Sequence, residues 1–173
     1  ACHALLFHLA LQHCRLALQI APDNAAAHYR VAVILIGTGR AVGAGKHLQE
    51  AARLKPSWVA PINTAAWLLA THPNANIREP REAVQLAQKA AALTDRQDAT
   101  VLDTLAAAFA AEGQFDQAVL TGKEALSLAL ANQEDALADK IRKRLILYRQ
   151  ETPYHDSTPS SAPSARNPLH DGQ

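Results

Sequence analysis

The chain has 173 residues, with 17 lysines and arginines against 16 aspartates and glutamates, and 49% of its residues are hydrophobic. This length suits one domain or one repeat array, and a net charge of +1 provides no long-range field to hold a polyanion such as nucleic acid. Alanine and leucine make up about a third of the chain and aromatic residues only 5%, which favours closely packed helices over a β-sandwich. Methionine is absent, also at position 1, so we expect a piece of a longer protein.

The strongest pattern is an internal repeat of 34 residues. Ala10, Cys14, Ala17, Ile20 and Pro22 correspond to Ala44, Leu48, Ala51, Leu54 and Pro56. A second set, His28, Val31, Ala32 and Leu35, recurs as Ile62, Ala65, Ala66 and Leu69 and, after an interval of 40, as Leu102, Leu105, Ala106 and Phe109. About five extra residues fall between Thr71 and Glu79, and insertions confined to loops are what a helical repeat tolerates.

In chain order, the periodicity predicts a helix over 3–20, then the helix pairs 24–38 and 41–54, 58–71 and 80–94, and 98–112 and 115–130, and a last helix over 133–149. These helices group into a partial unit 1–22, full units 25–58, 59–98 and 99–132, and a capping helix 133–150 with one polar face. Residues 151–173 are rich in proline and serine and almost free of apolar residues, so we predict a disordered tail.

Small residues recur where the two helices of a pair should meet. Because leucine would force the helices apart, we expect three alanine pairs to be buried there: Ala32 with Ala44, Ala66 with Ala83, and Ala106 with Ala118. Ala51, Ala90 and Ala125 are expected to pack in the same way against the following unit. The sequence therefore predicts an all-α array of antiparallel helix pairs.

A 34-residue unit with small residues at these spacings and proline at its end resembles the tetratricopeptide repeat (TPR). The segments "NTAAWLLATHP", "REAVQLAQKAAALT" and "VLDTLAAAFAAEGQFDQAV" further resemble the C-terminal TPR arrays of large bacterial multidomain proteins, some of which carry a membrane-embedded glycosyltransferase-like part. The resemblance covers about residues 3–150 and implies a right-handed superhelical solenoid with a concave groove. The chain departs from the pattern in the missing first helix of its first unit, in His28 at the usual aromatic position, and in Ala41.

Motifs of catalytic, cofactor or metal sites are not supported. The stretch "VAVILIGTGRAVGAGKH" imitates a phosphate loop, but Arg40 stands where the first glycine is required and His47 follows Lys46 in place of a hydroxyl residue. Successive histidines His3, His8 and His13 are turned about 140° apart on a helix and cannot share a metal ion. Cys2 and Cys14 would lie about 18 Å apart on that helix, beyond disulfide reach. We predict no enzyme, no cofactor and no metal.

The remaining candidate site is the groove. In a TPR superhelix the first helices of the units line the concave surface, which places six side chains there: Tyr29, Val33, Asn63, Trp67, Asp103 and Ala107. Trp67 would offer a flat apolar platform for a peptide, and Asp103 would repel a carboxylate at its position. The alternative is that Tyr29 and Trp67 only fill space between helices and that Asn63 bonds a local backbone group.

Three functions stay open at this point. The first is a protein–protein interaction scaffold that binds a peptide or helix of an unknown partner in the groove, and the second is a non-catalytic spacer or substrate-presenting arm of a larger enzyme such as a membrane glycosyltransferase. The third is self-association through the apolar N-terminal end, Ala1–Ile20. The basic run Lys140–Arg149 fits a solvated helix face, and no apolar window is long enough to span a bilayer, so we expect a soluble segment on the cytoplasmic or periplasmic side of a bacterial cell.

Overall fold

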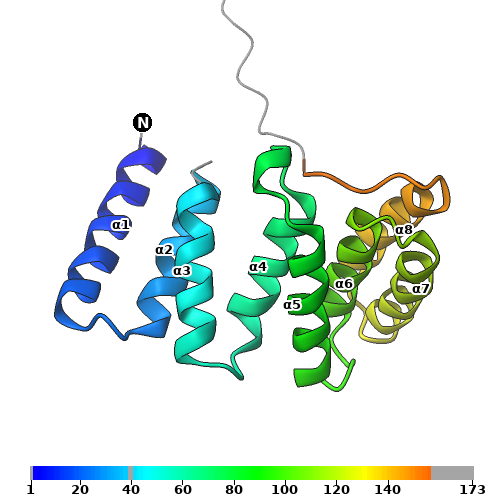
Figure 1. Cartoon of the computed structure of the whole chain (residues 1–173), viewed down its shortest axis with the longest axis horizontal. Coiled ribbons are helices and arrows are strands. Elements are labelled where there is room, and N and C mark those ends of the chain that lie inside the picture. Colours follow the sequence, from blue (N-terminus) through cyan, green and yellow to red (C-terminus); the bar gives the residue numbers. More distant parts are fainter. Residues whose placement is uncertain (1, 39–40, 157–173) are drawn as a thin grey trace, which may run out of the picture.

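The fold is described from a computed structural model, which describes residues 2–38 and 41–156. Within these ranges the chain forms α-helices and one short 3-10 helix, and no strand. The elements are α1 (Cys2–Ile20), α2 (Ala25–Gly37), α3 (Ala41–Leu54), α4 (Val59–Thr71), η1 (Ala75–Ile77), α5 (Pro80–Leu93), α6 (Ala99–Ala111), α7 (Phe115–Ala131) and α8 (Asp135–Arg149). Figure 1 shows the helices side by side in a row, with α1 at one end and α7 and α8 at the other. The predicted helical spans agree with these bounds to within two residues, so the all-α prediction is confirmed.

Local chemistry explains several helix ends. The side chain of Asn24 accepts a hydrogen bond from the Ala27 amide at the start of α2, and Asp98 accepts two, from Thr100 and Val101, at the start of α6. Pro80 is the first residue of α5, where its missing N–H would have no helical partner. The insertion between α4 and α5 contains η1, which lengthens the loop without disturbing the helix pair.

The small residues lie where the repeat pattern predicts. Ala32 and Ala44 are fully buried between α2 and α3, and so are Ala66 and Ala83 between α4 and α5. The pair Ala106 and Ala118 of α6 and α7 is buried too, as are the alanines expected to contact the next unit, Ala51, Ala90 and Ala125. The axes of paired helices therefore approach closely over a core in which alanine alternates with larger residues.

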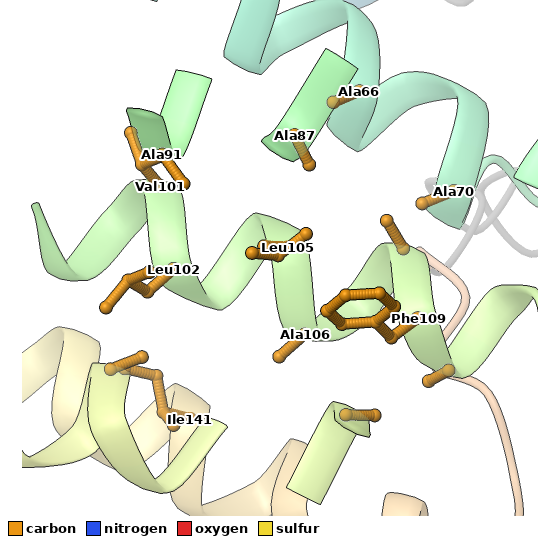
Figure 2. Packing of buried hydrophobic residues seen from close by; sticks show 14 of the residues in the cluster. Ala66, Ala70, Ala87, Ala91, Val101, Leu102, Leu105, Ala106, Phe109 and Ile141 are labelled. Atoms are coloured by element: carbon orange, nitrogen blue, oxygen red, sulfur yellow. The ribbon is translucent and has the colours of Figure 1, made fainter. Parts of the chain in front are cut away.

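Helix α6 is the most enclosed element. Every residue from Val101 to Ala110 is buried, because α4, α5, α7 and α8 all pack against this helix. Figure 2 shows α6 crossing the core, with Leu105 on the side of Ala87 and Leu102 on the side of Ile141 of α8. This enclosure decides which of the predicted groove residues are accessible.

The sequence predicts that no segment of the chain is long and apolar enough to span a bilayer. Among the residues that the structure describes, none of the helices has both the length and the apolar content needed to cross a membrane.

Candidate functional site

The first predicted groove residues, Tyr29 and Val33, lie on α2. The ring of Tyr29 meets that of Trp58 edge to face, with 5.1 Å between centroids, and its hydroxyl lies 3.4 Å from Oγ1 of Thr64 on α4. Because Thr64 Oγ1 already donates to the Ala60 carbonyl, at 2.8 Å, Tyr29 is the donor in this contact. Val33, one turn further along, leaves 45% of its surface exposed.

A hollow of about 460 Å³ lies between α1 and α2 and is lined in part by Tyr29 and Val33. The other lining residues are Ala10, His13, Cys14, Arg30 and Ile34. A second hollow of about 330 Å³ shares His13, Cys14 and Arg30 and continues along the same two helices toward Asn24. The walls are mainly apolar, and the polar side chains of His13 and Arg30 line both hollows, as in many binding clefts.

On α4, Asn63 and Trp67 are both half-buried. The Oδ1 atom of Asn63 is buried and accepts no hydrogen bond from the described residues, so the predicted bond to a local backbone group is not seen at this atom. The Trp67 ring carries the guanidinium of Arg144 over its face, 4.7 Å from the centroid, and its Nε1 donates to Oδ2 of Asp156 at 2.9 Å. Trp67 is therefore in contact with residues far along the chain.

Asp103 and Ala107 of α6 do not face an open groove. Asp103 is 4% exposed and forms an ion pair with Arg144 of α8, and Ala107 is 2% exposed. The expectation that these two side chains offer a surface to a partner is corrected by the structure, because α8 covers this side of α6. The prediction for Arg144 also needs correction, since this member of the basic run is buried and not on the solvated face.

The position of Arg144 in its helix carried a signal. It lies three residues after Ile141 and four before Tyr148, so it stands beside the apolar stripe of α8 that the periodicity identified. A basic residue there reaches the neighbouring helix, whereas Arg142 and Lys143 point to solvent.

The residues after α8 return along the array and contact α4. Glu151 has a left-handed backbone (φ 52°) and turns the chain, after which residues 152–156, here named the C-terminal strap, run back toward the end of α4 (Figure 1). The Asp156 amide donates to the Thr71 carbonyl at 2.8 Å, and Asp156 Oδ2 accepts from Thr71 Oγ1 at 2.9 Å as well as from Trp67. The prediction of a disordered tail therefore does not hold for residues 152–156, while residues 157–173 lie outside the described part of the chain.

The charged and polar groups beneath the strap are buried and interact mainly with one another. Burial raises the pKa of the Asp103 carboxyl, and the attraction of Arg144 opposes this rise. Burial also raises the pKa of Tyr148, with a further contribution from the Asp103 charge. Asp103 Oδ1, Arg144 Nε and the Tyr148 hydroxyl are buried without a hydrogen-bond partner among the described residues. A change that removes one member of this cluster would leave another buried group without its partner, which costs free energy.

Solved structures provide the comparison that decides the fold. Two crystal structures of MamA each align with 84% of this chain at 18% identity and a TM-score of 0.61, and the alignments cover 88% and 80% of the MamA chains. The 34-residue repeat, the buried alanines and this structural similarity all indicate the same fold. The chain has the all-α fold of a TPR-type solenoid. At this level of identity, the similarity to MamA establishes the fold alone.

Other comparisons add little to the TPR assignment. The crystal structure of the P58(IPK) TPR domain aligns with 86% of this chain and 55% of its own, at 21% identity, but its TM-score of 0.38 is too low to establish a common fold. No protein-family model matches the sequence, and neither does a curated protein. The function of this TPR solenoid must therefore be argued from its surface.

Proposed function

We propose that this TPR solenoid is a protein–protein interaction scaffold that binds a peptide or helix of a partner in its groove. The observation that carries the proposal is the apolar hollow of about 460 Å³ beside α2, which is lined by two of the predicted groove residues, Tyr29 and Val33. Tyr29 supplies a rigid aromatic surface and Arg30 a charged group at the rim, a combination typical of peptide-binding surfaces. The binding segment is expected to be apolar or of mixed character.

Peptides selected from a random phage-displayed library on the whole chain provide the test. Their affinity is measured by fluorescence anisotropy for the wild type, for Val33→Asp in the hollow, and for Leu120→Asp on the exposed surface of α7 as the matched control. We expect Val33→Asp to weaken binding by about tenfold or more, since a charge would be desolvated in an apolar cleft. The proposal fails if no peptide is selected, or if both variants bind as the wild type does.

A second function, self-association, is favoured by an exposed apolar stripe on α1. Leu9, Leu16 and Ile20 are all exposed at spacings of seven and four residues, which place them on one helix face. Sedimentation equilibrium over a hundredfold range of concentration measures this association. A concentration-dependent mass that Leu16→Glu abolishes supports it, and a monomer throughout rejects it.

A further inference from the structure

The C-terminal strap contacts the array through a small set of directional interactions. The Tyr154 ring lies 5.9 Å from that of Trp67, and the Arg144 guanidinium lies over both rings, 4.8 Å from Tyr154. Two residues later, the Asp156 carboxylate accepts hydrogen bonds from Trp67 Nε1 and Thr71 Oγ1. Tyr154 thus offers the face of its ring to the Arg144 cation, and Asp156 offers its carboxylate to two hydrogen-bond donors.

The spacing of these side chains is that of an extended peptide. Residues i and i+2 of an extended chain point to the same side, and the residue between them points away. Tyr154 and Asp156 are accordingly half-buried against α4 and α8, whereas His155 is exposed. A backbone hydrogen bond, from the Asp156 amide to the Thr71 carbonyl, fixes the register of the segment without reading its sequence.

The strap is held less firmly than the surface beneath it. The receiving side chains project from two helices of the core, and Arg144 is fixed by its ion pair with Asp103. The strap has no helical or sheet hydrogen bonds over 153–156, and its two contact residues keep part of their surface exposed. Segments with few buried contacts open at low free-energy cost while the core stays folded.

We infer that the surface formed by Trp67, Thr71 and Arg144 is a binding site for an extended segment with an aromatic side chain two residues before a carboxylate, and that Tyr154 and Asp156 occupy it in cis. A partner segment of the same chemistry must displace the chain's own strap to bind. This inference rests on the proposed role of the groove in peptide binding, but it concerns a different stretch of the groove from the hollow beside α2. It also assigns the partner a recognisable sequence pattern, aromatic–any–acidic.

The probe for the test is a fluorescein-labelled peptide with the sequence of residues 150–160, and the protein is the whole chain. Binding is measured by anisotropy to the wild type, to the double variant Tyr154→Ala/Asp156→Asn, and to the control Asp116→Asn, which removes an exposed carboxylate on α7. If the strap covers the site more than nine-tenths of the time, opening it raises the apparent affinity by about tenfold or more. Asp116→Asn should bind as weakly as the wild type.

Peptide variants then test the pattern on the double-variant protein. Replacing the tyrosine by alanine or the aspartate by asparagine is expected to weaken binding by about fivefold or more, whereas replacing the histidine between them leaves it unchanged. Equal affinity of the peptide for wild type and double variant would overturn cis occupation. Equal affinity of the aspartate and asparagine peptides would overturn the carboxylate requirement.

The indole N–H resonance of Trp67 gives a readout that does not depend on affinity. Trp67→Phe identifies the signal, since Trp58 supplies the other indole in the chain. Exchange of the charged Asp156 acceptor for a neutral amide, together with loss of the Tyr154 ring, should shift this resonance in the double variant, and saturating peptide should shift it back. A resonance that stays in place rejects the assigned contact. Val33→Asp separates the two hypotheses, because it should weaken the library-selected peptides and leave the strap peptide unaffected.

Discussion

Arg144 connects three segments that are far apart in the sequence. Its guanidinium forms an ion pair with Asp103 of α6, lies over the ring of Trp67 of α4, and lies over that of Tyr154 in the strap. A buried ion pair adds little net stability compared with apolar residues of the same volume, but removing one partner leaves a charge in a medium that cannot solvate it. The pair is therefore best understood as a device that fixes how α8 and the strap sit on α6.

Asp103→Asn is expected to destabilise the fold by about 3 kcal/mol or more, since Arg144 would remain buried without a counter-charge. The control is Asp139→Asn, which breaks the exposed contact between Asp139 Oδ1 and Arg142 Nη1 (2.6 Å) and should cost less than about 1 kcal/mol. Urea unfolding followed by circular dichroism measures both. Similar losses in the two variants would show that burial does not set the energy of the Asp103–Arg144 pair.

A histidine pair joins α2 to α3. His28 Nε2 donates to the Pro22 carbonyl at 3.0 Å, so in the neutral His28 ring Nδ1 is the acceptor for the Nδ1–H of His47, 2.9 Å away. Burial lowers the pKa of His47, and the charges of His28 and Arg15 lower it further. Glu50 of α3 is close enough to respond to the charge on His28.

The lowered pKa of His47 predicts a loss of stability on acidification. The unfolded chain takes up a proton as the pH falls through the ordinary value of 6.5, and the folded chain does so only at lower pH, so the stabilisation present above 6.5 decreases within that window. His155 keeps an exposed side chain, but partial desolvation and the charge of Arg78 lower its pKa as well, so it acts in the same direction. Melting temperatures between pH 8 and 5 should therefore fall less in His47→Gln than in the wild type, with His155→Gln measured separately. An unchanged slope in His47→Gln would contradict this role.

At the scale of elements, the helices pair through alanine. Because alanine places only a methyl group at the contact, the axes of the paired helices lie close together. Larger buried residues such as Leu48 and Ile62 fill the remaining space in the core. Gly122 of α7 is an extreme case, since a Cβ there would lie 2.8 Å from Leu145 Cδ2 of α8. The Leu145 side chain of the capping helix therefore packs directly against the α7 backbone at Gly122.

Ala66→Leu places three additional carbons between α4 and α5, where Ala66 and Ala83 are fully buried, and should destabilise the chain by about 1–3 kcal/mol. Ala92→Leu is the matched change on the exposed side of α5 and should stay within about 0.5 kcal/mol of the wild type. Chemical unfolding of the two proteins side by side gives the difference. A tolerant Ala66→Leu would show that close helix approach is not required at this pair.

For the whole molecule, burial is distributed unevenly along the solenoid. One apolar cluster extends from α4 to α8 and encloses α6, while a smaller one joins α1, α2 and α3 to α4. Among the described residues, α1 contributes fewer buried side chains to these clusters than α6 does, so it is expected to open more easily than α6. Helix α1 also borders the hollow proposed to bind a peptide.

Native-state hydrogen exchange should reveal this gradient. Amides of α6 are expected to exchange at rates close to those of global unfolding, and amides of α1 at least about a hundredfold faster, because α1 opens without disrupting the larger cluster. Mass spectrometry of peptic fragments resolves the two helices. Equal protection of α1 and α6 would indicate a single cooperative unit.

The sequence by itself determined the helices and their pairing. Residues three and four apart on a helix and 34 apart in a repeat obey local and periodic constraints, so the positions of Ala66 and Ala106 in the core could be inferred without a structure. The side of α2 that carries Val33 was located by the same reasoning. Periodicity states which face of a helix is apolar and which face is opposite to it.

Tertiary structure alone decided which parts of that opposite face stay open. The bonds that cover it join Asp103 to Arg144, 41 residues apart, and Trp67 to Asp156, 89 residues apart. Neither pair belongs to the repeat, and the strap lies in a segment whose composition predicts disorder. The position of the strap depends on hydrogen-bond donors, aromatic rings and the buried Arg144 cation, which come together only after the helices have packed. No local sequence pattern predicts these contacts.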